Sequence, residues 1–312
     1  MEKRKLIIDT DCGSDDAVAI AMAMREPSVE VLMLVTVDGN VPMEQAAKNT
    51  LTALEYADTY YPPVYRGSSR PLLREPVYAY ETHGSDGLGD LGFVPKKTCL
   101  SEGNGIVKML EILQKSNPGE IEIVTLGPLT NLAIALMLDS AALSKAKRIY
   151  SMASSGLGIG NVSPVAEFNI WHDAESAKIF LEANLPITFI GWDACLGEAM
   201  LEEDDIEKIR NSGTLGRFAI DSNRQLLELN RSRFGRPALD MADPAAMAAV
   251  LCPECIKDCN EYFCEIDISQ GPSYGAMLVD RYHEFGKKPN AALVSSLKAG
   301  LYKQYLVKTL TI

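Results

Sequence analysis

The sequence predicts an α/β protein: a single-domain, open, mostly parallel sheet flanked by helices. Short apolar runs typical of buried strands recur along the chain, helical patterns fill most of the gaps between them, and no linker-like segment divides it. The runs that predict strands span residues 6–8, 30–37, 121–126, 148–152, 187–191 and 262–268. Strands that alternate with helices form parallel sheets, because a parallel connection needs a long crossover.

The helices are predicted from apolar residues at helical spacing and from lengths that suit such crossovers. They span residues 17–24, 43–60, 105–116, 130–138, 173–182, 215–229 and 244–251. No segment is rich in Pro and Ser, low in complexity or internally repeated. We therefore expect residues 1–312 to form one domain.

The composition excludes several classes of partner. The chain has 312 residues, of which 47% are hydrophobic, so it can bury a substantial core. Its net charge of −12 and its pI near 4.8 argue against nucleic acid and anionic membranes, which bind basic surfaces. The first apolar run is too short for a signal peptide, and no run reaches the length of a membrane span. Seven cysteines, an odd number, fit reduced thiols, so we expect a cytoplasmic protein.

The most informative segment is the turn between the first predicted strand and helix, which holds Asp9, Asp11, Asp15 and Asp16. Ligands of open α/β sheets bind at such turns, beyond the carboxyl ends of the strands. Crowded carboxylates raise one another's pKa unless a cation lies among them. Because no soft ligand is interleaved at zinc spacing, the segment predicts calcium or magnesium. An alternative, in which Asp15 and Asp16 cap the helix and Asp9 is a solvated strand end, fits one or two acids but not four.

Two further segments carry polar side chains. The loop over residues 161–169 contains Asn161, Glu167 and Asn169, and amides with carboxylates suit the hydroxyls of a polyol, which both donate and accept. Ordinary turn chemistry explains the same residues equally well. Asp243 stands directly before Pro244 at the start of a predicted helix, where it is either an N-cap or a metal ligand.

Together these residues resemble the nucleoside hydrolase family, the inosine-uridine preferring N-ribohydrolases. The resemblance covers nearly the whole chain and rests on residues 9–16, Asp38-Gly39-Asn40, Gly127-Pro128-Leu129-Thr130-Asn131, Asn161 with Glu167-Phe168-Asn169, and Asp243-Pro244. The family's fold is an open, mostly parallel sheet flanked by helices, with one calcium ion at the bottom of the site. The resemblance therefore implies this fold and hydrolysis of the N-glycosidic bond of ribonucleosides to ribose and base.

The resemblance also implies roles for individual residues. Asp11, Asp16, Asp243 and the backbone carbonyl of Leu126 would bind the calcium ion. Asp11 would also act as the general base on the attacking water beside that ion. The side chains that would hold the ribose hydroxyls are Asp15, Asn40, Asn161, Glu167 and Asn169. Their negative field suits an oxocarbenium-like transition state. As in relatives, we expect a homodimer or homotetramer.

The chain departs from the family where the leaving group would lie. Relatives that cleave inosine or uridine carry His directly before the Asp-Pro pair, where this chain has Ala242, which neither donates a proton nor stacks. Of the three histidines, His83 is the predicted catalytic replacement, because its loop folds near the site in this family. His172 is expected to be structural, and His283 is expected to lie at the surface.

Two other groups of side chains have competing interpretations. In this family residues 219–236 would face the base, and Arg231 or Arg233 would stabilise the leaving group through bidentate hydrogen bonds, although a solvated helix face carries such residues too. Four cysteines superficially resemble a zinc or iron-sulfur site, but they lack the long gap between two C-x-x-C pairs, so we expect buried free thiols. They are Cys252, Cys255, Cys259 and Cys264.

Two other functions stay open. A haloacid dehalogenase-type phosphatase also begins with a strand that runs into Asp-x-Asp, but that family has Thr or Val where this chain has Gly13, and it does not account for Glu167-Phe168-Asn169. A nucleoside- or ribose-binding protein would keep the calcium pocket and lose catalysis with the missing histidine. Asp11 argues against it, because a binding protein needs no water-activating base.

Overall fold

The computed structural model describes residues 3–311. Within these residues the strands form one nine-stranded sheet in the order β3-β2-β1-β4-β5-β6-β9-β7-β8. Their bounds are β1 Arg4–Thr10, β2 Val29–Thr36, β3 Val64–Arg66, β4 Ile121–Thr125, β5 Arg148–Met152, β6 Ile187–Ile190, β7 Ile256–Ile266, β8 Met277–Asp280 and β9 Ala291–Leu297. Neighbours from β3 to β9 pair in parallel, and β7 pairs antiparallel with β9 and β8. The predicted open, mostly parallel sheet is confirmed.

The order in which successive strands are added to the sheet reverses beside β1, although the strands there remain parallel. Strand β1 lies between β2 and β4, and the chain continues from β2 to β3 on one side and from β4 to β5 and β6 on the other. Such a switch point leaves a crevice beyond the strand ends, where open α/β sheets bind ligands. Asp9 of β1 is paired with Thr125 of β4, so Asp11 and Leu126 follow neighbouring strand ends.

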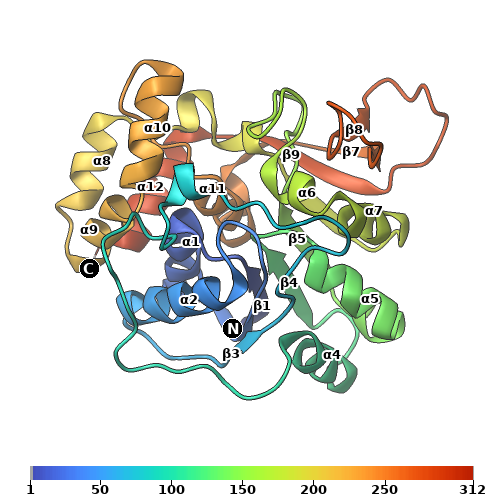
Figure 1. Cartoon of the computed structure of the whole chain (residues 1–312), viewed down its shortest axis with the longest axis horizontal. Helices are drawn as coiled ribbons and strands as arrows, with labels where there is room; N and C mark the ends of the chain where they lie inside the picture. Colours follow the sequence, from blue (N-terminus) through green and yellow to red (C-terminus); the bar gives the residue numbers. More distant parts are fainter. Residues whose placement is uncertain (1–2, 312) are drawn as a thin grey trace.

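Helices cover both faces of the sheet (Figure 1). Helices α1, α2, α9, α11 and α12 pack in one apolar core, and α4, α5 and α7 pack in the other. The α-helices are α1 Ser14–Arg25, α2 Met43–Ala57, α3 Tyr80–His83, α4 Gly105–Lys115, α5 Thr130–Leu143, α6 Phe168–His172, α7 Ala174–Glu182, α8 Glu203–Arg210, α9 Thr214–Asp221, α10 Arg224–Phe234, α11 Ala242–Leu251 and α12 Ala299–Leu310. The 3₁₀ turns are η1 Trp192–Cys195, η2 Gly197–Ala199 and η3 Pro253–Cys255.

Both faces of the central strands are therefore buried. In β1, Leu6 and Ile8 point into the first core and Ile7 into the second. This explains why the central strands read as continuous apolar runs instead of alternating patterns. Within residues 3–311, no helix is both long and apolar enough to cross a membrane.

The prediction of one helix over residues 215–229 is wrong. The chain breaks between α9 and α10, where the Asn223 side-chain amide donates to the carbonyl oxygens of Ser14 (3.1 Å) and Ala219 (2.9 Å). A break caused by a contact with α1 leaves no trace in local periodicity. The N-cap interpretation of Asp243 is also wrong, because α11 begins one residue earlier and Met241 precedes it. The sequence patterns missed β3, β8, β9, α3, α6, α8 and α12.

Candidate active site

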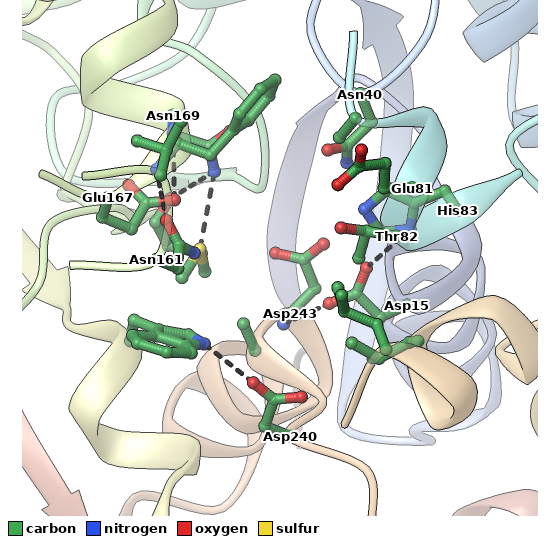
Figure 2. A pocket seen from close by; sticks show the side chains of 18 of the residues that line it. Asp15, Asn40, Glu81, Thr82, His83, Asn161, Glu167, Asn169, Asp240 and Asp243 are labelled. Carbon is green, nitrogen blue, oxygen red and sulfur yellow. Dashed lines mark hydrogen bonds and ion pairs between the residues drawn. The ribbon is translucent and has the colours of Figure 1, made fainter. Parts of the chain in front are cut away.

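A cavity of about 550 Å³ lies beyond the carboxyl ends of the parallel strands. Its wall is formed by loops that follow β1, β2, β4, β5 and β6, together with α3 and α10. Figure 2 shows polar side chains that face one another across this space. Eight of the predicted site residues line it, namely Asp15, Asn40, His83, Leu126, Asn161, Glu167, Asn169 and Asp243. Asp11 and Asp16 do not line the cavity, and both are fully buried.

Asp11 and Asp16 are held by a network of short hydrogen bonds. Thr10 Oγ1 donates to Asp16 Oδ1 (2.6 Å), and the Gly13 amide donates to Asp16 Oδ2 (2.9 Å). Asn40 joins the two acids, because its backbone N–H donates to Asp11 Oδ2 (2.7 Å) and its side chain donates to Asp16 Oδ2 (3.1 Å). The turn after β1 and the loop after β2 therefore form one rigid unit.

The acids of two helices meet at the floor of the cavity. The Asp243 amide donates to Asp15 Oδ2 (3.3 Å), and oxygens of Asp15, Asp16 and Asp243 all lie within 4.8 Å of one another. Asp11 is not part of this group. However, Asp11 Oδ1 and Asp243 Oδ1 are buried and lack any hydrogen-bond partner within residues 3–311. Buried orphan carboxylate oxygens are costly unless a cation satisfies them.

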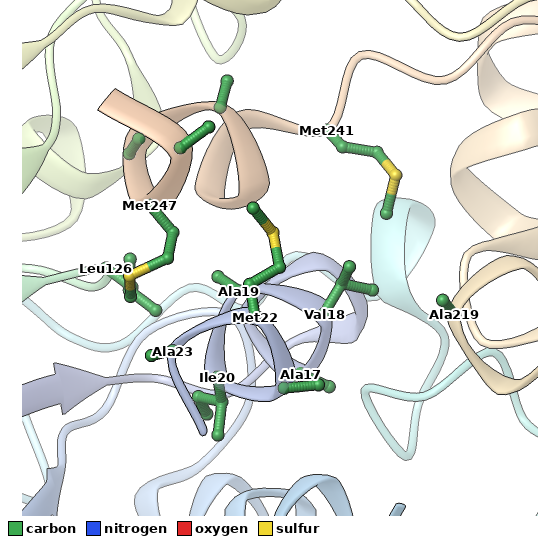
Figure 3. Close-up of a cluster of buried hydrophobic side chains, with 14 of the residues drawn as sticks. Ala17, Val18, Ala19, Ile20, Met22, Ala23, Leu126, Ala219, Met241 and Met247 are labelled. Carbon is green, nitrogen blue, oxygen red and sulfur yellow. The ribbon is translucent and has the colours of Figure 1, made fainter. Parts of the chain in front are cut away.

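The packing of α1 against α11 brings these acids together. Alanine occupies alternate positions in α1, at Ala17, Ala19, Ala21 and Ala23, and α11 carries further alanines. Figure 3 shows α1 and α11 side by side, with buried apolar side chains such as Met22 and Met247 between and beside them. Both helices present their first turns to the cavity, where the helix dipole favours negative charge.

Burial changes the protonation of these carboxyl groups. It raises the pKa of Asp9 and of Asp15 to about 7. Burial, followed by the charges of neighbouring carboxylates, raises the pKa of Asp11 and Asp243 well above the usual value. The interpretation of Asp9 as a solvated strand end is wrong, because its buried Oδ2 accepts a bond from Asn131 Nδ2 (2.8 Å). This cluster is unfavourable in its charged form without a compensating cation.

The opposite wall carries the polar loop that follows β5. Glu167 caps α6, and its carboxylate accepts backbone N–H bonds from Asn169 (2.9 Å) and Ser154 (3.0 Å). Asn169 Nδ2 donates to the carbonyl of Leu126 (2.6 Å), and Asn161 Oδ1 accepts from the Phe168 amide. Turn chemistry and a hydroxyl-binding role are thus compatible, since these bonds fix side chains that still line the cavity.

His83 lies on the same side as Asp15 (Figure 2). The Ser14 amide donates to His83 Nδ1 (3.2 Å), so the proton of the neutral ring is on Nε2. Ser14 Oγ lies 2.9 Å from the same nitrogen and donates to Asn223 Oδ1. Burial lowers the pKa of His83 to about 4. At neutral pH the ring is therefore uncharged, which favours hydrogen-bond donation over proton transfer.

A group that the sequence did not predict forms the wall beside Ala242. Trp192 follows β6, and its indole Nε1 donates to Asp240 Oδ2 (3.1 Å). Asn230 Nδ2 donates to the other oxygen of Asp240 (2.6 Å). Trp192, Asp240, Ala242 and Arg233 line the cavity, and Asn230 does not. The position of Trp192 directly after a predicted strand was a usable signal, because residues at parallel strand ends meet at one edge of the sheet.

The structure distinguishes the two arginines of α10. Arg233 lines the cavity, with its guanidinium carbon 5.8 Å from the centroid of the Trp192 ring. Arg231 does not line it, and its guanidinium pairs with Glu228 on the exposed face of the helix (2.9 Å). The hypothesis of a leaving-group arginine therefore has a geometric basis for Arg233 alone.

His172 and the cysteines lie outside the cavity lining. His172 ends α6 and is buried, with Nε2 3.2 Å from Asp38 Oδ2 and Nδ1 3.2 Å from the Val77 carbonyl, which agrees with a structural role. His283 is exposed. Cys255 and Cys264 are buried, but the prediction of a buried thiol is wrong for Cys259, which is exposed on β7. Within residues 3–311 the cysteines form no group of three at metal-ligand spacing.

Comparisons with known proteins agree with this geometry. The sequence profile of the inosine-uridine preferring nucleoside hydrolases matches residues 6–304. The pyrimidine-specific ribonucleoside hydrolase RihB of Escherichia coli (strain SE11) is 31% identical over 291 residues, which are 93% of this chain and 91% of that protein.

Solved structures lead to the same family. The plant nucleoside hydrolase PpNRh1 superposes with a TM-score of 0.90 and 28% identity, over 99% of each chain. An inosine-guanosine nucleoside hydrolase superposes with a TM-score of 0.89 and 27% identity, over 99% of this chain and 98% of that one. The chain therefore belongs to the inosine-uridine preferring nucleoside hydrolase family and is a hydrolase of N-glycosidic bonds in ribonucleosides.

Proposed function

We propose that this chain hydrolyses ribonucleosides to ribose and base in a calcium-dependent reaction with Asp11 as the general base. One observation carries the proposal: within the described residues, Asp243 at the floor of the cavity and the buried Asp11 near it each have an unpartnered carboxylate oxygen, and the cavity walls carry amide and carboxylate groups. The floor suits a cation, and the walls suit a polyhydroxylated sugar. The two features together match the bond that this family cleaves.

The residues present fit a hard divalent cation. The ligands would be carboxylate oxygens of Asp11, Asp16 and Asp243 and the carbonyl oxygen of Leu126, with Asp15 close enough to contribute. The group contains only oxygen donors, which calcium prefers. When bound, calcium supplies a positive charge that lowers the pKa of the attacking water. The Leu126 carbonyl is already held in place by Asn169 Nδ2.

The side chains of the protein would have separate roles in the reaction. Asp11 Oδ1, which has no partner within the described residues, would accept the proton of the attacking water. The residues that would bind the ribose hydroxyls are Asp15, Asn40, Asn161, Glu167 and Asn169. Their negative field would stabilise the positive charge that develops on the sugar as the glycosidic bond breaks. His83 would donate a hydrogen bond from Nε2 to the bound nucleoside.

The test is release of reducing sugar from purine and pyrimidine ribonucleosides and nicotinamide riboside, with and without a calcium chelator. Asp11→Asn is the sharper variant, because its side-chain oxygen can still accept the Asn40 amide while the base is lost. We expect the chelator to abolish turnover and Asp11→Asn to reduce kcat by about 10²- to 10⁴-fold. Full activity in the chelator would refute calcium dependence. If ribose binds but no nucleoside is cleaved under any condition, the site is a binding site.

We also propose a cytoplasmic homodimer or homotetramer. The seven cysteines are all unpaired, including Cys252 and Cys255, whose sulfur atoms lie 3.0 Å apart, and free thiols fit a reducing compartment. Light scattering after size-exclusion chromatography tests the oligomeric state, and a single monomer peak at micromolar concentration would refute it.

A further inference from the structure

We propose that Arg233 is the leaving-group residue of this active site. It would donate hydrogen bonds to the departing base and stabilise its negative charge, in place of a proton donor at position 242. This inference rests on the proposed N-ribohydrolase function and names the residue that Ala242 leaves undetermined.

The guanidinium of Arg233 is available for a ligand. Arg233 is exposed at its position on α10, lines the cavity, and makes no hydrogen bond or ion pair within residues 3–311. A guanidinium carries five N–H donors in a rigid fork, so an unpaired one at a cavity wall is suited to a planar acceptor. Arg231 provides the contrast, since Glu228 occupies its guanidinium outside the cavity.

The surroundings orient Arg233 toward the cavity. Its guanidinium carbon lies 5.8 Å from the ring centroid of Trp192, within reach of a cation–π interaction. The indole itself cannot turn freely, because Asp240 accepts its Nε1 proton and is in turn held by Asn230. Burial raises the pKa of Asp240, and the hydrogen bonds from Asn230 and Trp192 together with the positive charge of Arg233 oppose this shift. The side chains of Arg233, Trp192 and Asp240 therefore hold one another in place along this wall.

The neighbouring side chains on this wall cannot donate hydrogen bonds to the departing base. Leu226 and Leu229 of α10 line the cavity beside Arg233, and Ala242 lines it from the start of α11. None of the three has a side-chain donor. Both carboxylate oxygens of Asp240 already accept hydrogen bonds, from Trp192 Nε1 and Asn230 Nδ2. Among the cavity-lining residues of α10, of the start of α11 and of the turn after β6, Arg233 and the already bonded Trp192 Nε1 carry side-chain donors, whereas His83 lies on α3 beside Asp15.

The chemistry balances without an acid from the protein. The bond between the anomeric carbon and the base nitrogen breaks, and its electron pair stays on the base. The water oxygen bonds to the anomeric carbon, and Asp11 accepts the water proton. Arg233 contributes hydrogen bonds and its positive charge and gives up no proton. The anionic base takes up a proton from solvent after it leaves, and Asp11 returns its proton to solvent.

The experiment compares Arg233→Ala with Arg231→Ala, two residues away on the same helix. Each variant is assayed on the best ribonucleoside and on p-nitrophenyl β-D-ribofuranoside, whose leaving group is stable as an anion without help. We expect Arg233→Ala to lower kcat/KM on the ribonucleoside by about 10- to 100-fold and on the nitrophenyl riboside by less than about 3-fold. Arg231→Ala should change neither, and Arg233→Lys should restore part of the loss.

Two outcomes overturn the inference while the proposed function stands. One is an unchanged kcat/KM for Arg233→Ala on the ribonucleoside, and the other is an equal fall on both substrates, which would indicate a role in shape or sugar binding. If the wild-type protein cleaves neither substrate in the presence of calcium, the proposed function fails, and the role of Arg233 fails with it. Thermal unfolding of each variant shows whether it is folded, which an exposed position on α10 favours.

Discussion

Gly39 shows how closely the chain is packed around the proposed base. A Cβ atom at this position would lie 2.1 Å from Oδ2 of Asp11, and 2.7 Å from its Cβ and Cγ. We expect Gly39→Ala to push the Asp11 carboxylate or the Asn40 loop aside and to lower kcat by about 100-fold, because small displacements of reacting groups are costly. Steady-state kinetics on the preferred nucleoside measures this.

Gly271→Ala is the matched control for that prediction. No atom lies within 4 Å of a Cβ at Gly271, so this variant should keep full activity. If Gly39→Ala also keeps full activity, catalysis does not depend on the position of Asp11 in the way we propose. Calcium titration by thermal shift would then show whether the metal site tolerated the same displacement.

At the residue level, sequence reasoning located the acids because four carboxylates in one turn repel one another unless a cation lies among them. It did not locate Trp192 or Asp240, whose importance depends on contacts between distant segments. It also left Arg231 and Arg233 equivalent, although they differ by two positions on α10 and point in different directions. The position of each arginine around the helix axis decides which of them faces the cavity. This position could not be predicted while α9 and α10 were treated as one helix.

At the scale of elements, His172 links three segments that build the site. It closes α6, which carries Asn169, and its two ring nitrogens contact Asp38 after β2 and the Val77 carbonyl before α3. Asp38 is buried, and its Oδ2 lies 3.2 Å from His172 Nε2, so the ring is one of the few polar partners of this carboxylate. Removing one member of a buried pair leaves the other uncompensated.

We therefore expect His172→Ala to lower the free energy of unfolding by about 3–5 kcal/mol. Urea denaturation of His172→Ala and His283→Ala, side by side, measures the difference. His283 is exposed, so its variant should unfold like the wild type. A change below about 1 kcal/mol for His172→Ala would show that the pair is not a major link between these segments.

Two of the strands that sequence patterns missed have physical explanations. β9 contains Ala and Ser at four of its seven positions, so its side chains carry little strand propensity, and it is held by pairing with β6 and β7. β3 has only three residues and forms the edge of the sheet. By contrast, β1, β2, β4, β5 and β6 were predicted because burial on both faces makes them continuously apolar.

For the whole molecule, the topology explains why distant acids share one site. The switch point at β1 and β4 places Asp11 and Leu126 just beyond neighbouring strand ends, and the close packing of α1 and α11 adds Asp15, Asp16 and Asp243. These contributions come from opposite ends of the chain and are joined only by the fold. The charge density of the turn predicted a cation. That α11 would bring Asp243 to this turn could be seen only in the tertiary structure.

The same cluster predicts how calcium and pH together control stability. Burial raises the pKa of Asp9, Asp15 and Glu167 to about 7. The folded state therefore favours the protonated carboxyl, and this stabilisation is complete below the ordinary pKa near 4 and is lost as the pH rises through about 7. Without metal, the protein should become less stable across that interval. The proposed calcium ion would bind the ionised form and displace protons, so its stabilising effect should grow as the pH rises.

Thermal unfolding in calcium and in chelator at pH 5, 6, 7 and 8 checks this, with the gain in Tm from calcium smallest at pH 5 and largest at pH 8. Asp243→Asn is the informative variant, because it removes one buried charge and one proposed ligand. It should raise the Tm of the metal-free protein at pH 8 and reduce the gain from calcium. A gain that is independent of pH, or one that Asp243→Asn leaves intact, would place the cation outside this cluster.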